Sequence, residues 1–207
     1  TYEPLSGTSV SRDFVELPSQ LFEHWLTVPE VLKRFAIHYK TKSPISEKLM
    51  ERLIGASNYD MGYQTVEYTS SALVDLYFHL EDTEKDVMEL QNEILSKIGL
   101  PEAIKMRHAT PHFAHVFSGG YYAAAYYSYM WSEVMDADAF SAFEELDNPF
   151  DANLAKSLED NILSKGNSLD PEIAYKRFRG SLPKVDALLR GRGLSLIHIS
   201  EPTRPSS

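Results

Sequence analysis

Apolar residues recur every three to four positions along most of the chain, the spacing of helices that bury one face. The clearest case is residues 59–80, a largely apolar and aromatic stretch without proline, in which Leu73, Leu76, Tyr77 and Leu80 have core spacing. Strand-like alternation of apolar and polar residues is scarce. The pattern therefore predicts an all-α fold in one domain without a clear internal boundary.

Capping residues, glycines and prolines indicate where the helices begin and end. Ser46 is expected to cap the helix that follows it, and Gly99 to end a helix over residues 83–98. Asp13, with Glu16 as capping-box partner, is expected to start a helix that Pro18 limits at its N-terminal side. Residues 105–120 are expected to be rich in loops, and further helices are expected over residues 29–39, 121–146, 152–164, 171–178 and 184–190.

The amino-acid composition excludes several kinds of binding partner and site. The chain has 20 Lys and Arg against 30 Asp and Glu, a net charge of −10, so its field opposes nucleic acids and anionic membranes. No apolar run approaches the roughly 20 residues that cross a bilayer. The absence of cysteine excludes disulfides, thiolate metal sites and cysteine nucleophiles. It fits a cytoplasmic location, although a periplasmic protein can also lack cysteine.

The two ends of the sequence suggest a piece of a longer protein. The first residue is Thr1, not Met. Residues 195–207 do not continue the preceding pattern and resemble one reading frame of a transposase adapter used in sequencing libraries. We therefore divide the chain into residues 1–194 and a non-native tail, 195–207, with a genuine flexible terminus as the alternative.

Three groups of residues could carry chemistry. In the first, Glu16, Gln20 and Glu23 have the spacing of one helix face, so the two carboxylates could serve a metal ion directly and from behind its ligands. The alternative is that Glu16 belongs to a capping box and Glu23 is exposed to solvent.

The second group is His108, His112 and His115, whose spacing is that of metal ligands on a helix. Pro111 lies inside this span and favours extended backbone, which speaks against helical ligand geometry. The alternative is that one histidine donates a hydrogen bond in a cleft.

The third group follows Gly119 and Gly120, which permit a bent or mobile loop. Tyr122, Tyr126 and Tyr129 have helical spacing, so three phenols could line one face and donate hydrogen bonds to a developing oxyanion. The alternative is an aromatic core stripe whose hydroxyls reach backbone partners.

Two long motifs carry a resemblance to a known family. SGTSVSRDFVELPSQLFEHW, at residues 6–25, resembles the segment after the zinc motif of the thimet oligopeptidase and peptidyl-dipeptidase family of zinc metallopeptidases. FAHVFSGGYYAAAYYSYMWSEV, at residues 113–134, is similar to that family's substrate loop, and YKRFRGSLPKVDALLR, at residues 175–190, to its C-terminal end. The bacterial peptidyl-dipeptidase and oligopeptidase A branch is the most similar.

The resemblance implies the C-terminal part of a helical zincin-like catalytic domain that cleaves short peptides and is monomeric when intact. It implies that Glu16 is the third zinc ligand and that Glu23 supports the zinc site from behind. It also implies that Tyr129, helped by His115, stabilises the oxyanion. The substrate-binding residues that it implies are Tyr126 and either Tyr121 or Tyr122, beside the loop of Gly119 and Gly120.

The chain departs from the family in one respect, since it contains no His-Glu-x-x-His sequence. That motif carries two zinc ligands and the general base, and in the family it lies just upstream of the segment that begins here. We therefore expect the isolated chain to be inactive. The rival hypothesis is a non-catalytic all-α scaffold or binding domain, in which the Tyr and Glu residues are structural.

Overall fold

The computed structural model describes residues 2–80 and 85–194. Within these ranges the chain forms helices joined by loops, with one isolated antiparallel bridge between Ile37 and Pro44 and no strand, so the predicted all-α fold is confirmed. The α-helices are α1 (Leu17–Glu23), α2 (Pro29–Phe35), α3 (Glu47–Gly55), α4 (Met61–Leu80), α5 (Val87–Lys97), α6 (Ala114–Phe117), α7 (Ser128–Glu145), α8 (Ala152–Leu158), α9 (Pro171–Arg179) and α10 (Asp186–Gly191). Short 3₁₀ helices are η1 (Glu3–Leu5), η2 (His24–Thr27), η3 (Thr110–His112) and η5 (Gly166–Ser168), and η4 (Glu159–Leu163) is a π-helix.

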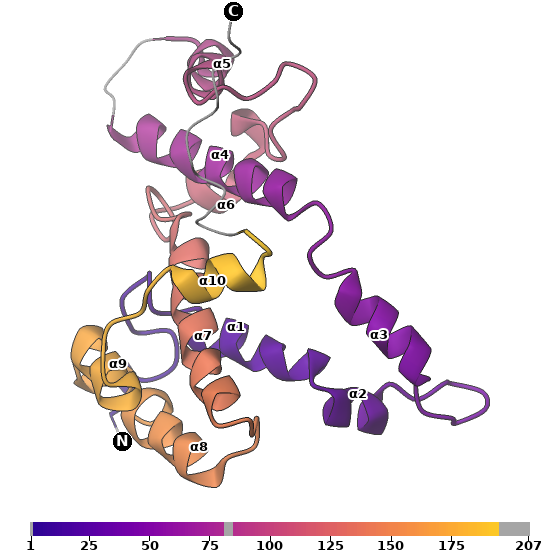
Figure 1. The fold of residues 1–207 in the computed structure, drawn as a ribbon. Helices are drawn as coiled ribbons and strands as arrows, with labels where there is room; N and C mark the ends of the chain where they lie inside the picture. Colours follow the sequence, from indigo (N-terminus) through magenta and orange to yellow (C-terminus); the bar gives the residue numbers. More distant parts are fainter. Residues whose placement is uncertain (1, 81–84, 195–207) are drawn as a thin grey trace, which may run out of the picture.

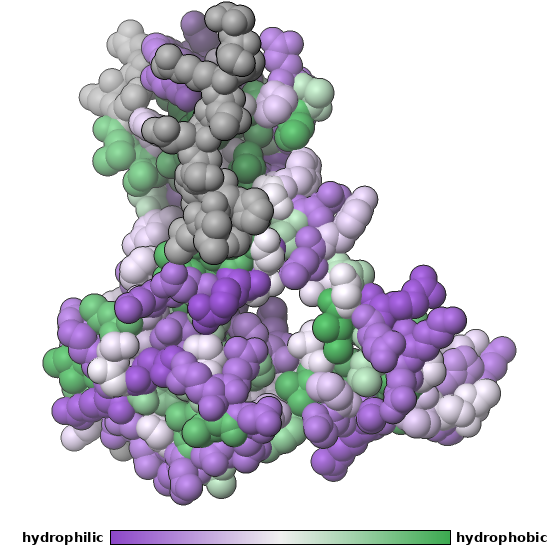
Figure 2. Space-filling model, viewed as in Figure 1, coloured by the Kyte–Doolittle hydropathy of each residue, from purple (hydrophilic) through white to green (hydrophobic). Residues whose placement is uncertain are grey.

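Helix α7 runs through the lower half of the molecule, with α1, α8, α9 and α10 around it (Figure 1). The most extensive helix contacts are those of α1 and of α10 with α7. Helices α4, α5 and α6 form the upper half, and α2 and α3 extend to one side (Figure 1). The space-filling view is correspondingly lobed, with hydrophilic side chains covering much of the arm formed by α2 and α3 (Figure 2). The long helix α7 therefore supports α1 along its length.

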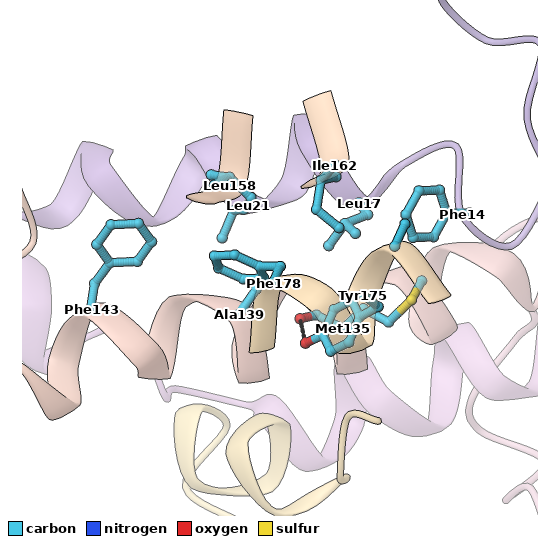
Figure 3. Packing of buried hydrophobic residues seen from close by; sticks show 11 residues of the cluster. Phe14, Leu17, Leu21, Met135, Ala139, Phe143, Leu158, Ile162, Tyr175 and Phe178 are labelled. Atoms are coloured by element: carbon cyan, nitrogen blue, oxygen red, sulfur yellow. Dashed lines mark hydrogen bonds between the residues drawn. The ribbon is translucent and has the colours of Figure 1, made fainter. Parts of the chain in front are cut away.

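The main hydrophobic core lies where α1 packs on α7. Leu17 and Leu21 of α1 are 1% and 0% exposed, and they face Met135, Ala139 and Phe143 of α7 (Figure 3). Side chains from α8, η4 and α9 close this core, and they are Leu158, Ile162, Ala174, Tyr175 and Phe178. The Tyr175 hydroxyl donates to the Met135 carbonyl at 2.8 Å, so the largest buried phenol is also satisfied. This packing fixes where α1 begins relative to α7.

A second, smaller core joins α4 to α5, built from Val74, Leu90, Ile94 and Leu95. The two halves of the molecule meet at Arg192, which follows α10. Its guanidinium donates to both carboxylate oxygens of Glu133 on α7 and to Thr65 Oγ1 on α4. These bonds hold α4 beside the first turns of α7.

Most expected helix ends are close to the observed ones. Ser46 caps α3 as predicted, since its hydroxyl accepts from the Leu49 N–H. The expected capping role of Asp13 is wrong, because α1 begins at Leu17 with Glu16 as its N-cap. Pro18 explains the late start: a helix that reached further back would place the proline ring against an earlier carbonyl.

The expected helix over residues 121–146 is wrong in its first part. Residues 121–127, which we call the tyrosine segment, form turns, and α7 begins only at Ser128. Ala124 has a φ of 56°, in the left-handed region that interrupts a right-handed helix. Tyr122, Tyr126 and Tyr129 therefore do not share one helix face.

The expected helix over residues 152–164 is present as α8 followed by the π-helix η4. In the described part of the chain, no helix is long and apolar enough to cross a membrane. The tail at 195–207 and the expected start of a helix at residue 83 lie outside the described residues.

The packing of α1 on α7 yields a stability prediction. Leu21→Ala should lower the free energy of unfolding by about 2–5 kcal/mol, because it opens a cavity in a fully buried site. Leu26→Ala, at a side chain that is 63% exposed, should change it by less than about 0.5 kcal/mol. Urea unfolding of both variants measures this, and equal effects would contradict the assigned core.

Candidate active site

Four of the sequence-predicted residues lie together although they come from distant parts of the chain. Glu16 is the N-cap of α1, His115 lies on α6, Tyr122 lies in the tyrosine segment and Tyr129 lies in the first turn of α7. We call these four residues the candidate cluster. Two hydrogen bonds and stacked rings connect these residues.

The Glu16 carboxylate is not used for capping. Its Oε1 accepts from the Tyr122 hydroxyl at 3.0 Å, and its Oε2 accepts from the Ser19 hydroxyl at 3.0 Å. The interpretation of Glu16 as a capping-box residue is therefore wrong. A carboxylate oriented by two hydroxyls is held ready to act as an acceptor or a ligand.

His115 and Tyr129 form the second linked pair. His115 Nε2 lies 3.0 Å from the Tyr129 hydroxyl, and the His115 ring stacks on Tyr122 at 4.3 Å between centroids. Tyr122 stacks in turn on Tyr129 at 5.4 Å. Gln20 of α1 donates to the Tyr129 carbonyl at 3.2 Å, which ties α1 to the start of α7. The imidazole and two phenols thus form one packed group beside Glu16.

A cavity of about 610 Å³ opens beside this group. Its lining includes the imidazoles of His108, His112 and His115 and the phenols of Tyr126 and Tyr129. A larger cavity, of about 780 Å³, lies between the N-terminal segment and η4, and its lining contains no carboxylate or imidazole. The smaller cavity therefore offers the groups that bind and polarise a polar ligand.

The described residues do not provide a complete set of ligands for a zinc ion. Within residues 2–80 and 85–194, no three His, Asp or Glu side chains gather closely enough to hold a metal. His108, His112 and His115 line one cavity, but they do not form a ligand set in this part of the chain. Glu16 offers one carboxylate, and a catalytic zinc needs three protein ligands. The described chain by itself does not complete such a site.

The electrostatics of Tyr129 favour a hydrogen-bond donor. Burial raises the pKa of Tyr129 well above its usual value, and the neighbouring Tyr122 hydroxyl and the Glu16 charge raise it further. The phenol therefore keeps its proton. When His115 Nε2 carries a proton, it donates to the Tyr129 oxygen and leaves the Tyr129 proton free for another acceptor. A neutral phenol beside a polar cavity can stabilise a developing oxyanion.

Tyr126 lies at the wall of the cavity and Tyr121 points elsewhere. Tyr126 makes an edge contact with Tyr129 at 5.6 Å, and burial raises the pKa of its phenol. Tyr121 is 55% exposed and carries the Arg12 guanidinium 3.2 Å from its ring centroid. Of the two tyrosines that the sequence left open, Tyr122 contacts Glu16, His115 and Tyr129, whereas Tyr121 packs against the ring of Tyr122.

The remaining sequence-predicted residues lie outside the cluster. Glu23 is exposed at the end of α1. Burial raises the pKa of Asp136 to about 6, the hydrogen bond with His24 opposes this, and the charge of Glu23 adds to the rise. Gly119 and Gly120 are exposed, and a side chain added at either would meet no atom within 4 Å. Neither glycine is required by local sterics.

Sequence analysis missed the residues that shape the tyrosine segment. Asp75, on α4 and 1% exposed, accepts from the backbone N–H groups of Ala124 and Tyr126. Tyr68, about two turns earlier on the same face of α4, donates its hydroxyl to the Tyr126 carbonyl. The available signal was an aspartate inside an otherwise apolar run, because a buried carboxylate needs partners.

The pKa values of Tyr121 and Tyr129 should be shifted in opposite directions from the ordinary tyrosine value. The Arg12 hydrogen bond, followed by that of Thr8, lowers the pKa of Tyr121, whereas burial raises that of Tyr129. In an ultraviolet titration of phenolate, Tyr121→Phe should remove an early-ionising group. Tyr129→Phe should leave the curve unchanged near the ordinary tyrosine pKa of about 10. Loss of early absorbance in Tyr129→Phe would contradict the assigned surroundings.

Comparison with known proteins places the chain among peptidases. The pattern of Peptidase family M3 matches residues 1–194. Dipeptidyl carboxypeptidase of Escherichia coli is 40% identical over 200 residues, which are 94% of this chain and 29% of that protein. Oligopeptidase A of the same organism is 39% identical over 197 residues, covering 92% of this chain and 28% of that protein.

A more distant relative shows the same partial coverage. The thimet-like oligopeptidase of Dictyostelium discoideum is 33% identical over 197 residues, which are 93% of this chain and 29% of that protein. The chain thus spans less than a third of the length of the curated relatives that it matches. Since the family match includes all of its described residues, the chain belongs to Peptidase family M3.

Proposed function

We propose that this chain is the C-terminal part of the catalytic domain of a zinc metallopeptidase that hydrolyses short peptides. The relatives named above are an oligopeptidase and a dipeptidyl carboxypeptidase, so an oligopeptidase or peptidyl-dipeptidase activity is the proposed class. The chain covers less than a third of these relatives. The proposed activity therefore belongs to a longer enzyme that includes this sequence.

The observation that carries the proposal is the position of Tyr129 and His115 beside Glu16. Tyr122 bridges them, since its hydroxyl donates to Glu16 and its ring stacks on both His115 and Tyr129. The Glu16 carboxylate, which could bind a metal, and the neutral Tyr129 phenol, which could stabilise an oxyanion, are therefore both in contact with one side chain, Tyr122. Metal-dependent peptide hydrolysis uses a metal ligand and an oxyanion donor of this kind at one carbonyl.

The proposed zinc ion depends on further ligands from the longer enzyme. Glu16 supplies one of three protein ligands, and two histidines and a general base would come from a His-Glu-x-x-His sequence that this chain lacks. When bound, zinc lowers the pKa of water and polarises a carbonyl. Because the described residues hold no complete metal site, we expect the isolated chain to be inactive.

The chain's own residues bind the peptide and stabilise the charge. The Tyr129 hydroxyl donates to the oxyanion that forms on the scissile carbonyl, and protonated His115 frees that donor. Tyr126 in the cavity wall and Tyr122, stacked on His115 and Tyr129, are proposed to bind the substrate, and Gly119 and Gly120 to form the exposed loop that precedes them. Glu23 is proposed to support the zinc site from behind its ligands.

Removal of the Tyr129 hydroxyl tests the oxyanion role. In the full-length enzyme, Tyr129→Phe should lower kcat by roughly tenfold to a thousandfold, the cost of one oxyanion donor. Tyr127→Phe, at a neighbouring phenol that is 47% exposed, is the matched control and should leave kcat unchanged. Steady-state hydrolysis of a fluorogenic peptide measures both variants. Wild-type turnover in Tyr129→Phe would reject the role.

Removal of the Glu16 charge tests the metal role. In the full-length enzyme, Glu16→Gln keeps the size of the side chain but should lose most of the bound zinc, because a neutral amide is a weaker ligand. Glu30→Gln on α2 serves as the control at an exposed carboxylate. Metal analysis after dialysis gives the occupancy. Full zinc occupancy in Glu16→Gln would show that another residue is the ligand.

A further inference from the structure

Helix α4 carries a buried carboxylate, that of Asp75, to which the proposed function assigns no role. Asp75 is 1% exposed and follows the fully buried Val74 in the middle of α4. Its Oδ1 accepts from the Ala124 N–H at 3.0 Å, and its Oδ2 accepts from the Tyr126 N–H at 2.9 Å. Both carboxylate oxygens therefore accept hydrogen bonds from the backbone of the tyrosine segment. A buried charge placed in this way holds a chain conformation.

His79, one turn later on α4, completes the arrangement. Its Nδ1 lies 3.0 Å from Asp75 Oδ1 and 2.8 Å from the Asp75 carbonyl oxygen. Since both neighbours are acceptors, Nδ1 carries the proton and donates to them. The His79 ring also stacks on Phe117 of α6 at 5.4 Å. The pair thus contacts the two segments that carry Tyr122 and His115.

The backbone that Asp75 holds is one that would not form by itself. Ala124 adopts a φ of 56°, which costs energy for any residue with a Cβ. The Asp75 carboxylate accepts from the N–H of this same residue. Tyr68, also on α4, donates its hydroxyl to the Tyr126 carbonyl and stacks on the Tyr126 ring. Side chains of α4 thus occupy three backbone polar groups of residues 124–126.

The position of this turn sets the geometry of the candidate cluster. Tyr122 lies two residues before Ala124, and Tyr129 lies three residues after Tyr126. If the turn relaxed, Tyr122 would lose its fixed position between Glu16 and His115. We propose that Asp75, oriented by His79, is a positioning residue that fixes the tyrosine segment so that Tyr122 and Tyr129 face the reacting carbonyl. This inference rests on the proposed function.

The direct test replaces Asp75 by an isosteric side chain. Asp75→Asn turns one acceptor into a donor that faces a backbone N–H, so one of the two bonds is lost. Amide hydrogen exchange at Ala124 and Tyr126 should become faster in this chain. In the full-length enzyme, kcat should fall roughly tenfold to a hundredfold with zinc content unchanged, because a small misplacement of catalytic groups costs that much. KM should change by less than about threefold.

Two matched variants separate positioning from simple loss of stability. Asp151→Ala removes a carboxylate that also accepts from two backbone N–H groups, at 3.0 and 2.8 Å, but at the start of α8, where it caps the helix. It should lower the unfolding temperature comparably and leave kcat unchanged. His79→Asn keeps a donor near the position of Nδ1 and should retain kcat, whereas His79→Leu should lower it.

The outcomes are distinct from those of the proposed function. If the full-length wild-type enzyme hydrolyses no peptide, the proposed function fails, and the exchange rates still decide whether Asp75 fixes the segment. If the wild type is active and Asp75→Asn keeps both its kcat and its slow exchange, the positioning role is wrong. If Asp151→Ala lowers kcat as strongly as Asp75→Asn, the effect is one of stability and the inference is overturned.

Discussion

The packing of α1 against α7 determines where the groups of the candidate cluster lie. Leu17 and Leu21 are almost completely buried against α7, and this apolar contact leaves the two helices little freedom to slide. Glu16 directly precedes Leu17, and Tyr129 lies in the first turn of α7. Burial of leucine side chains therefore brings a carboxylate beside a phenol, although 112 residues lie between them in sequence.

Hydrophobic packing alone does not explain the tyrosine segment, which polar contacts from α4 hold in place. Asp75 and Tyr68 form hydrogen bonds with its backbone, and these bonds take the place of helical ones. Tyr122 can then stack between His115 and Tyr129. The site thus combines a rigid pair of helices, which sets its position, with a turn that sets the directions of its side chains.

These two contributions also explain what the sequence could and could not predict. Apolar spacing and caps such as Ser46 report local preferences, so the all-α class and most helix ends followed from them. The helix expected from residue 121 failed because the tertiary bonds of Asp75 outweigh the helical preference of three consecutive alanines. The motifs named Glu16, His115 and Tyr129 together, but only the fold shows that Tyr122 rather than Tyr121 joins them.

The proposed mechanism requires that Glu16, as a zinc ligand, and Tyr129, as an oxyanion donor, act on one scissile carbonyl. The most direct measurement is a crystal structure of the full-length enzyme with zinc and a phosphinic peptide, which mimics the tetrahedral intermediate. We expect that structure to show Glu16 bound to zinc and the Tyr129 hydroxyl within hydrogen-bond distance of a phosphinate oxygen. A zinc ion held without Glu16, or a phosphinate out of reach of Tyr129, would contradict it.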